Sequence, residues 1–349
     1  HQKKNVMQTI GVSLLINLLV GLVVSAGLYV FAPQLLGLMG LSPQLIDCGK
    51  VYMQIVGGFS FLQAIAMTLS ATLRSHNQAF YPMYVTLLMN VLNVAGNYLL
   101  IFGKFGFPAL GAPGAAVSTS VCRLIAMCLL GYLLFRKVVP DFSFKYLRPF
   151  PWDKVKNLMV VGLPAAGEQV SYNLSQVVIT YFSVLIGTAA LTARTYAMNI
   201  VMFSYVFSIA LGNGAAICIG HLIGAEKDNA AYSVEKYSIW LSVIITVVIS
   251  VFTALIGTNI FQLLSPNPEV VKIGAAVLYV DIVLEIGRAV NITSVDSLIA
   301  AGDVFYPFIT GIIVMWGVAT LCAYLLGVWW GWGLTGIWLA KRRDRKSVV

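Results

Sequence analysis

The chain has 349 residues, of which 59% are hydrophobic and only 10% are charged. A soluble protein keeps roughly 25% charged residues to cover its surface, so this composition excludes an ordinary soluble domain and indicates a protein that lies in lipid. The net charge of +9 then indicates basic loops beside a membrane. Because no basic stripe is interleaved with aromatic residues, we do not expect nucleic-acid binding.

Apolar runs of bilayer length recur along the whole chain. A transmembrane helix needs about 20 predominantly apolar residues. Such runs lie near residues 8–32, 51–73, 83–103, 113–135, 157–186, 190–222, 237–263, 274–300 and 305–328, and a shorter tenth run covers 333–340. The runs are too long for membrane strands and lack a period of two. The sequence therefore predicts an all-α polytopic membrane protein.

Basic residues are concentrated in alternate loops. One set of loops holds Lys3, Lys4, Arg74, Arg136, Lys137, Lys145, Arg148, Lys154, Lys156, Lys227 and Lys236, whereas the intervening loops hold Lys50, Lys104 and Lys272. By the positive-inside rule the first set faces the cytoplasm. We therefore expect a multi-pass protein of a bacterial inner or plasma membrane.

The chain also resembles itself at an offset of 222–225 residues, which indicates an internal repeat. The matched positions are Gln2–Asn5 with Glu226–Asn229, Ser42-Pro43 with Ser265-Pro266, Phe80–Pro82 with Phe305–Pro307, and Gly111 and Gly114 with Gly333 and Gly336. Because the matched loops lie on the same side of the membrane, the repeat is parallel, as in two-lobed transporters. We expect an N-terminal lobe over residues 1–145 and a C-terminal lobe over 146–340.

The repeat also predicts that this chain contains fewer helices of the first lobe than of the second. Runs 157–186 and 190–222 precede the matched loop of the second lobe, whereas the first lobe begins at that loop. We therefore expect two further helices before residue 1. A charged run such as Lys341–Lys346 does not continue a lipid-facing helix cheaply. We interpret 341–349 as a truncated or non-native tail after an incomplete last helix.

Several short motifs of glycine, proline and polar residues resemble motifs of the multidrug and toxic compound extrusion (MATE) transporters. The motifs that carry this resemblance are Leu73-Arg74, Phe80-Tyr81-Pro82, Asn90-Val91-Leu92-Asn93, Gly103-Lys104-Phe105-Gly106, Gly111-Ala112-Pro113-Gly114-Ala115-Ala116, Gly162-Leu163-Pro164 with Glu168, Ala300-Ala301-Gly302-Asp303 and Gly333-Leu334-Thr335-Gly336-Ile337-Trp338. The resemblance covers nearly the whole chain, and it numbers the spans three to twelve.

The resemblance implies a monomeric secondary active antiporter, not an enzyme. It would export organic, cationic or aromatic drugs in exchange for H⁺ or Na⁺ by alternating access of two six-helix lobes, with no cofactor besides the coupling ion. The alternative is a flippase of the same superfamily that moves a lipid-linked precursor. A long basic stripe through the central cleft would favour the flippase, and the sequence offers only Arg123 and Arg288 for it.

Glu168 is the leading candidate for the coupling group. It follows Pro164 by one turn, and Tyr172 and Gln176 lie on the same helix face at i+4 and i+8. An ionisable group inside a span is costly, so its default interpretation is functional. Such a carboxylate suits reversible protonation, and its oxygen-rich neighbours equally suit Na⁺. The structural alternative is a hydrogen-bonding anchor between helices.

A polar stripe on run 274–300 holds further candidates. Asp281, Glu285, Arg288 and Asp296 fall within one arc of the helix, and Asn291 is a secondary candidate on the same run. Many family members carry a cation-binding Asp where this chain resembles them but has Arg288. The pattern leaves two interpretations open: a cation-coupling and substrate site, or a structural Glu285–Arg288 pair.

Secondary candidates lie elsewhere in the chain. Asn93 and Asn97 share a face of run 83–103, Thr119 lies on the next run, and Asn199 lies near the start of run 190–222. Archaeal-type members resemble this chain here but carry an Asp where it has Asn97, which weakens cation binding in the first lobe. Hydrogen bonds between helices are the favoured interpretation of these amides.

Overall fold

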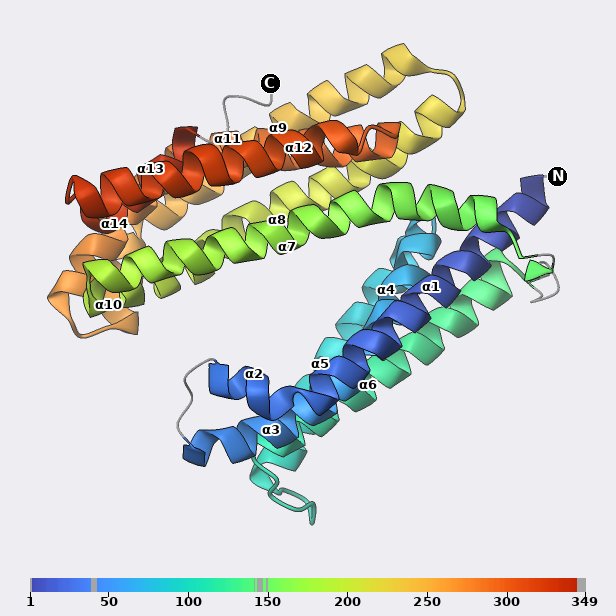
Figure 1. Cartoon of the computed structure of the whole chain (residues 1–349), viewed down its shortest axis with the longest axis horizontal. Helices are drawn as coiled ribbons and strands as arrows, with labels where there is room; N and C mark the ends of the chain where they lie inside the picture. The colour runs from blue at the N-terminus through green and yellow to red at the C-terminus, as the bar shows by residue number, and fades with distance from the viewer. Residues whose placement is uncertain (1, 39–42, 141, 143–146, 149, 344–349) are drawn as a thin grey trace. The chain divides into compact units, whose positions relative to one another are not determined.

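In the computed structural model, residues 2–38, 43–140, 142, 147–148 and 150–343 are described, and all regular elements among them are helices. Of the tail predicted at 341–349, residues 341–343 belong to the last helix, α14 (Gly333–Arg343), and 344–349 lie outside the described residues. The chain divides into two compact units, His1–Leu158 and Met159–Val349 (Figure 1). Each unit has its own hydrophobic core.

The first unit is built from long helices and short flanking ones. Its elements are α1 (Gln2–Val30), α2 (Ala32–Leu38), α3 (Pro43–Gly58), α4 (Ser60–Ser75), α5 (Phe80–Phe102), α6 (Ala112–Leu133) and the π-helix η1 (Leu134–Val138). α1 packs against α3 and α4, and α6 packs against α3, α4 and α5.

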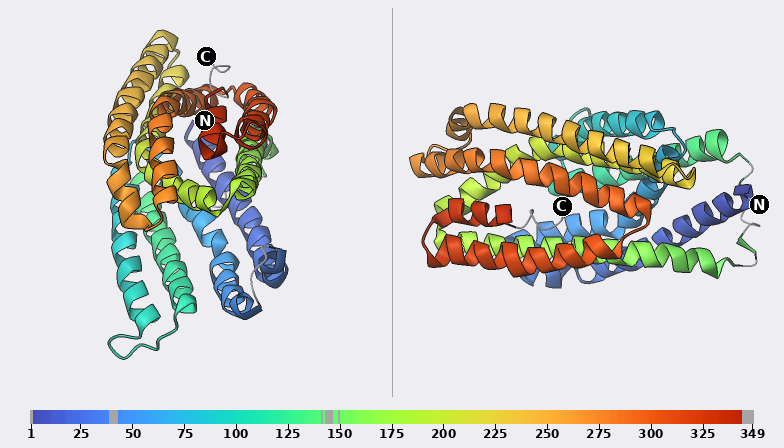
Figure 2. Two further views of the ribbon diagram at one scale, coloured as in Figure 1. Left: turned by 90° about the vertical axis from the view of Figure 1, so that its left-hand side faces the viewer. Right: turned by 90° about the horizontal axis from the view of Figure 1, so that it is seen from above.

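The second unit holds the longest described helices, and the first of them begins at Trp152, seven residues before the unit itself. Its elements are α7 (Trp152–Ile186), α8 (Thr188–Gly224), α9 (Asp228–Leu255), α10 (Gly257–Leu264), α11 (Pro268–Ala301), α12 (Phe305–Ile313), the π-helix η3 (Val314–Thr320), α13 (Leu321–Ala323), the π-helix η4 (Tyr324–Trp329) and α14 (Gly333–Arg343). Helices α8, α9 and α11 pack side by side, and α14 lies against α11 (Figure 2).

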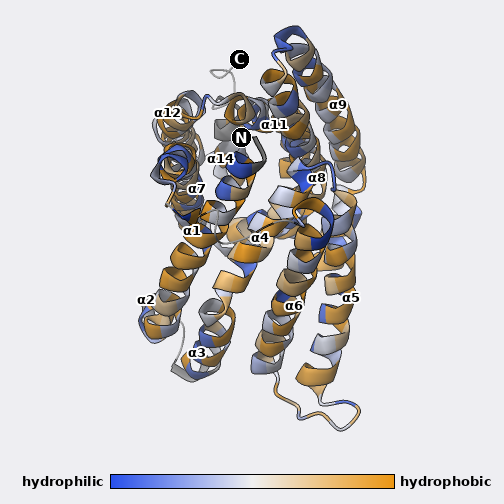
Figure 3. Ribbon diagram, turned by 90° about the vertical axis from the view of Figure 1, so that its right-hand side faces the viewer, coloured by the Kyte–Doolittle hydropathy of each residue, from blue (hydrophilic) through white to orange (hydrophobic). Residues whose placement is uncertain are grey.

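Among the described residues, seven segments are long and apolar enough to cross a membrane, against the ten runs expected from the sequence. They are Lys4–Val30, Gly49–Ser75, Phe80–Phe102, Ala112–Val138, Thr188–Gly224, Asp228–Leu255 and Phe305–Trp329. α7 and α11 have 35 and 34 residues, but polar residues interrupt their apolar surface. α14 has only 11 residues. Figure 3 shows apolar residues along most of the length of α1, α5 and α6.

The bounds of the helices confirm the internal repeat. α1 ends at residue 30 and α9 at 255, α3 begins at 43 and α11 at 268, and α5 begins at 80 and α12 at 305. The offset is therefore constant over three pairs of elements. The turns before α5 and α12 also correspond, because Asn77 and Gly302 both have positive φ values, of 58° and 95°.

The matched glycines have the same steric role in both units. A Cβ added at Gly114 would lie 2.4 Å from the carbonyl oxygen of Leu100, and one at Gly336 would lie 2.6 Å from that of Leu326. These carbonyls also accept backbone hydrogen bonds, from Leu110 at 2.9 Å and from residue 332 at 3.2 Å. Glycine is therefore needed where α6 and α14 approach the backbone of the preceding helix.

Two predicted continuous spans are broken in the structure. The run 51–73 is divided at Phe59 between α3 and α4, and the run 237–263 is divided at Ile256 between α9 and α10. At the first break, the hydroxyl of Ser25 on α1 accepts a hydrogen bond from the amide of Phe61 at 3.0 Å. A break leaves backbone groups without their helical hydrogen bonds, and these groups need other protein partners because lipid offers none. The hydroxyl of Ser25, a residue that is only 3% exposed, is such a partner on a neighbouring helix.

Candidate functional site

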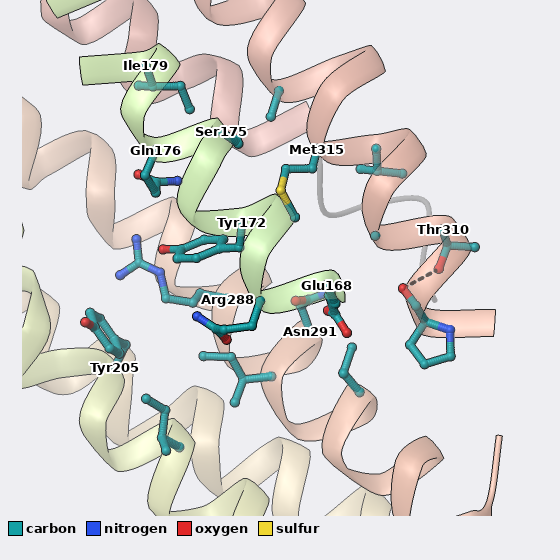
Figure 4. A pocket seen from close by; sticks show the side chains of 18 of the residues that line it. Glu168, Tyr172, Ser175, Gln176, Ile179, Tyr205, Arg288, Asn291, Thr310 and Met315 are labelled. Atoms are coloured by element: carbon teal, nitrogen blue, oxygen red, sulfur yellow. Dashed lines mark hydrogen bonds between the residues drawn. The ribbon is translucent and has the colours of Figure 1, made fainter. Parts of the chain in front are cut away.

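A cavity of about 440 Å³ lies within the second unit (Figure 4). Its wall is formed by residues of α7, α8, α11, α12 and η3. The lining combines polar and flexible apolar side chains: Glu168, Gln169, Tyr172, Ser175, Gln176, Met198, Tyr205, Arg288, Asn291, Thr310 and Met315. Such a concave site with a few polar groups is typical of small-molecule binding.

Glu168 lies in the cavity wall on α7, one turn beyond the buried Pro164. Within the part of the chain that the structure describes, its carboxylate accepts no hydrogen bond and has no salt bridge. Gly311 on α12 lies opposite, since a Cβ added there would be 3.6 Å from Oε1 of Glu168. The carboxylate therefore lies in the cavity wall, and no residue that the structure describes donates a hydrogen bond to it.

Asp296 on α11 is the second acid of this region. It acts electrostatically on Glu168, although it does not itself line the cavity. Its carboxylate packs against α8, because a Cβ added at Gly212 would lie 2.5 Å from Oδ2. Two carboxylates within electrostatic reach of each other repel, and a bound cation would relieve that repulsion.

Arg288 presents a cation to the cavity but is tied to two buried acids. It donates to Oε1 of Glu285 and, at 3.4 Å, to Oδ1 of Asp281. Its guanidinium carbon lies 5.3 Å from the ring centre of Tyr205. Asp281 also accepts from Nε1 of Trp338 at 3.0 Å. The predicted Glu285–Arg288 pair is therefore present in the structure.

The predicted site residues divide into lining and buried groups. Glu168, Tyr172, Gln176, Arg288 and Asn291 line the cavity. Asp281 and Glu285 are 2% and 0% exposed, lie behind Arg288, and do not line it. These two acids therefore partly neutralise the positive charge that Arg288 presents to the cavity.

Asn199 does not belong to this cavity. It is exposed on α8, and its amide donates to the carbonyl of Thr195 at 3.1 Å. Asn199 was a candidate because it is an amide near the start of an apolar run, and that position alone does not show which face of the helix is buried.

The amides of the first unit form a chain of hydrogen bonds. Asn97 Nδ2 donates to Asn93 Oδ1 at 3.1 Å, and Asn93 Nδ2 donates to Thr119 Oγ1 at 3.3 Å. This chain joins α5 to α6, as the favoured structural interpretation expected. Oδ1 of Asn97 is buried and has no partner among the described residues.

The opposite wall of the cavity contains a π-helix. η3 contributes Val314, Met315 and Ala319 to the lining, and Thr320 donates to the carbonyl of Met315, five residues earlier, at 2.9 Å. The hydroxyls of Thr320 and Ser175 lie 3.2 Å apart, which joins this bulge to α7. π-bulges occur frequently at functional sites. The sequence contained no signal for this one.

Comparison with known proteins assigns the family. The family profile described as MatE matches residues 1–99 and 164–325. The chain belongs to the MatE family. It is 39% identical over 344 residues to the uncharacterized transporter YisQ of Bacillus subtilis, covering 99% of this chain and 76% of YisQ. It is 24% identical to a probable multidrug resistance protein NorM of Thermotoga maritima, covering 87% of this chain and 65% of that protein.

Solved structures support the same fold. A MATE transporter in its bent conformation superposes with a TM-score of 0.85 at 17% identity, covering 98% of this chain and 80% of that one. The outward-facing structure of a multidrug resistance MATE transporter gives 0.86, with coverage of 98% and 79%. This MatE protein is therefore a multi-pass membrane transporter rather than an enzyme, and it is related to drug-efflux proteins.

Proposed function

We propose that this MatE protein is a secondary active antiporter in which Glu168 couples the export of organic compounds to the entry of H⁺ or Na⁺. It would act by alternating access, as a monomer in a bacterial inner or plasma membrane. The observation that carries the proposal is the position of Glu168, a carboxylate in the cavity wall with no hydrogen-bond donor among the described residues. A group in that state can bind a proton or cation and release it when a substrate enters.

The substrates that suit this cavity are flat aromatic compounds, cationic ones in particular. Tyr172 and Tyr205 offer rings, Met198 and Met315 offer adaptable apolar surface, and Glu168 offers a negative charge. Methionine and aromatic side chains repack readily around different ligands, as a multidrug site requires. Cations also bind over aromatic rings.

The flippase alternative has less support. It requires a basic stripe for the phosphate groups of a lipid-linked precursor. Among the described lining residues Arg288 is the single basic one, and it is already tied to Asp281 and Glu285.

The test is export of ethidium by everted membrane vesicles that contain the intact gene product. A pH gradient and a Na⁺ gradient are imposed separately. We expect Glu168→Gln to abolish gradient-driven export and to leave membrane insertion intact. Glu226→Gln, which removes an exposed carboxylate at the α8–α9 turn, is the matched control. Normal export by Glu168→Gln with its ion dependence retained would refute the proposed coupling role.

A further inference from the structure

A buried arginine lies next to the cavity. Arg194 on α8 is 4% exposed, and among the described residues it forms no salt bridge. Its Nη1 is buried and has no hydrogen-bond partner among the residues that the structure describes. A buried charge is costly unless it is paired, so such a residue is expected to have a specific task.

The partners of Arg194 are neutral oxygens on α7. Nη2 donates to Oε1 of Gln176 at 3.2 Å and to Oγ1 of Thr180 at 3.3 Å. Arg194 also lies within electrostatic reach of Tyr172. Gln176 and Tyr172 both line the cavity, whereas Arg194 and Thr180 do not. Arg194 therefore supports the cavity wall from behind.

This contact determines which way the amide of Gln176 points. A guanidinium group can only donate hydrogen bonds, so the atom of Gln176 that faces it must be the amide oxygen. The NH₂ group is then turned away from Arg194, and within the described residues it has no acceptor. Figure 4 shows Gln176 and Tyr172 pointing from α7 towards the side of the cavity on which Arg288 of α11 lies.

Arg194 is itself held in position by a second contact. Its guanidinium carbon lies 5.8 Å from the ring centre of Trp338 on α14, a residue that is 0% exposed. The indole of Trp338 donates to Asp281 at 3.0 Å, and Asp281 accepts from Arg288. The guanidinium of Arg194 is therefore part of a packed network and cannot turn freely away from Gln176.

We propose that Arg194 is a positioning residue that makes the amide of Gln176 a fixed hydrogen-bond donor, and that the cavity consequently prefers aromatic substrates bearing a carbonyl or carboxylate oxygen. This inference rests on the proposed function, since it takes the cavity to be the transport site. A donor whose direction is fixed discriminates better than a freely flipping amide, because a substrate without the acceptor leaves it unpaired.

Two dyes test this preference. Tetramethylrhodamine and pyronin Y have the same xanthene cation, but only tetramethylrhodamine carries a carboxyphenyl group. Binding to the purified intact gene product is measured by fluorescence anisotropy, and export by everted vesicles is measured in parallel. We expect the unmodified protein to bind tetramethylrhodamine about three- to tenfold more tightly than pyronin Y, the range of one modest hydrogen bond.

Gln176→Glu is the decisive variant. It keeps an oxygen for Arg194 but replaces the NH₂ donor with an acceptor, so we expect the preference for tetramethylrhodamine to disappear. Gln169→Glu adds the same charge to the cavity at a residue that forms no hydrogen bond with Arg194 in the described structure, and it measures the effect of charge alone. We expect Gln169→Glu to weaken tetramethylrhodamine binding less than Gln176→Glu does.

Arg194→Gln and Arg194→Lys test the positioning role. We expect Arg194→Gln to reduce the preference towards unity while pyronin Y still binds, and Arg194→Lys, which keeps one donor, to retain part of it. Should both Arg194 variants fail to fold, Gln176→Glu still decides. Equal affinities of the two dyes for the unmodified protein, or equal losses for both dyes in Gln176→Glu, would overturn the inference. Binding that shows the preference without gradient-driven export would instead refute the antiporter proposal alone.

Discussion

Arg288 lies against Tyr205, with its guanidinium carbon 5.3 Å from the ring centre, while it also donates to Glu285 and Asp281. The side chains of the two acids are 0% and 3% exposed, so Arg288 is the cation that compensates them. Oε2 of Glu285 is buried and has no partner among the described residues. The cluster is therefore sensitive to any change in its one arginine.

Replacement of Arg288 by Met is expected to destabilise the protein strongly. Removal of one partner of a buried ion pair costs about 3–5 kcal/mol, because a charge is left buried without compensation. Denaturation of the purified protein in SDS would measure the change in the free energy of unfolding. The double variant Arg288→Met, Glu285→Gln should recover part of the loss, since it removes one of the uncompensated charges. A loss of less than about 1 kcal/mol in Arg288→Met would show that the pair is not structurally important.

The matched glycines give a second prediction. Gly114→Ala and Gly336→Ala would each place a Cβ within 2.6 Å of a carbonyl oxygen of the preceding helix. Backbone cannot move aside as a side chain can, so we expect each substitution to cost about 1–3 kcal/mol. Gly27→Ala is the control, because no atom lies within 4 Å of its added Cβ. Equal unfolding midpoints for the three variants would contradict the proposed close approach.

The sequence predicted the helical architecture well because its signals were local or repeated. Bilayer-length apolar runs identified most of the helices, and the offset of matched prolines and aromatics located the two copies. The breaks at Phe59 and Ile256 could not be predicted, because the apolar runs 51–73 and 237–263 continue through them. The break at Phe59 is accommodated by Ser25, a small polar residue 36 positions from the amide that donates to it.

The sequence could predict only those site residues that lie on one face of a single helix. Glu168, Tyr172 and Gln176 are related by helical spacing, and the structure places all three in the cavity wall. The buried position of Asp281 involves a hydrogen bond from Trp338, 57 residues further along the chain. The contact of Arg194 with Gln176 joins α8 to α7, and no periodic signal in the sequence relates these two residues.

The hydrogen-bonded amides of the first unit give a third prediction. Thr119→Val removes the acceptor for Nδ2 of Asn93, at the end of the chain that begins at Asn97. Hydrogen bonds between membrane helices average about 0.6 kcal/mol, so we expect a destabilisation of about that size. The ion dependence of ethidium export should stay as in the unmodified protein, because these residues hold α5 to α6. A changed Na⁺ or pH dependence in Thr119→Val would instead indicate a cation site in the first unit.

Gly212 and Asp296 give the fourth prediction, which tests the acid pair without altering either acid. A Cβ added at Gly212 would lie 2.5 Å from Oδ2 of Asp296, so Gly212→Ala must displace the carboxylate. The displaced atom is the end of a side chain, and alanine favours a helix over glycine by about 1 kcal/mol, so little net stability should be lost. The electrostatic relation of Asp296 to Glu168 should nevertheless change.

We therefore expect Gly212→Ala to lower gradient-driven ethidium export by at least about threefold, a modest coupling energy between the two acids, with an unfolding midpoint close to that of the unmodified protein. Gly214→Ala is the matched control on the same helix, because nothing lies within 4 Å of its added Cβ. Export is measured in everted vesicles at several pH values. If both variants export ethidium at the unmodified rate over the whole pH range, the position of Asp296 does not matter for coupling and Glu168 acts alone.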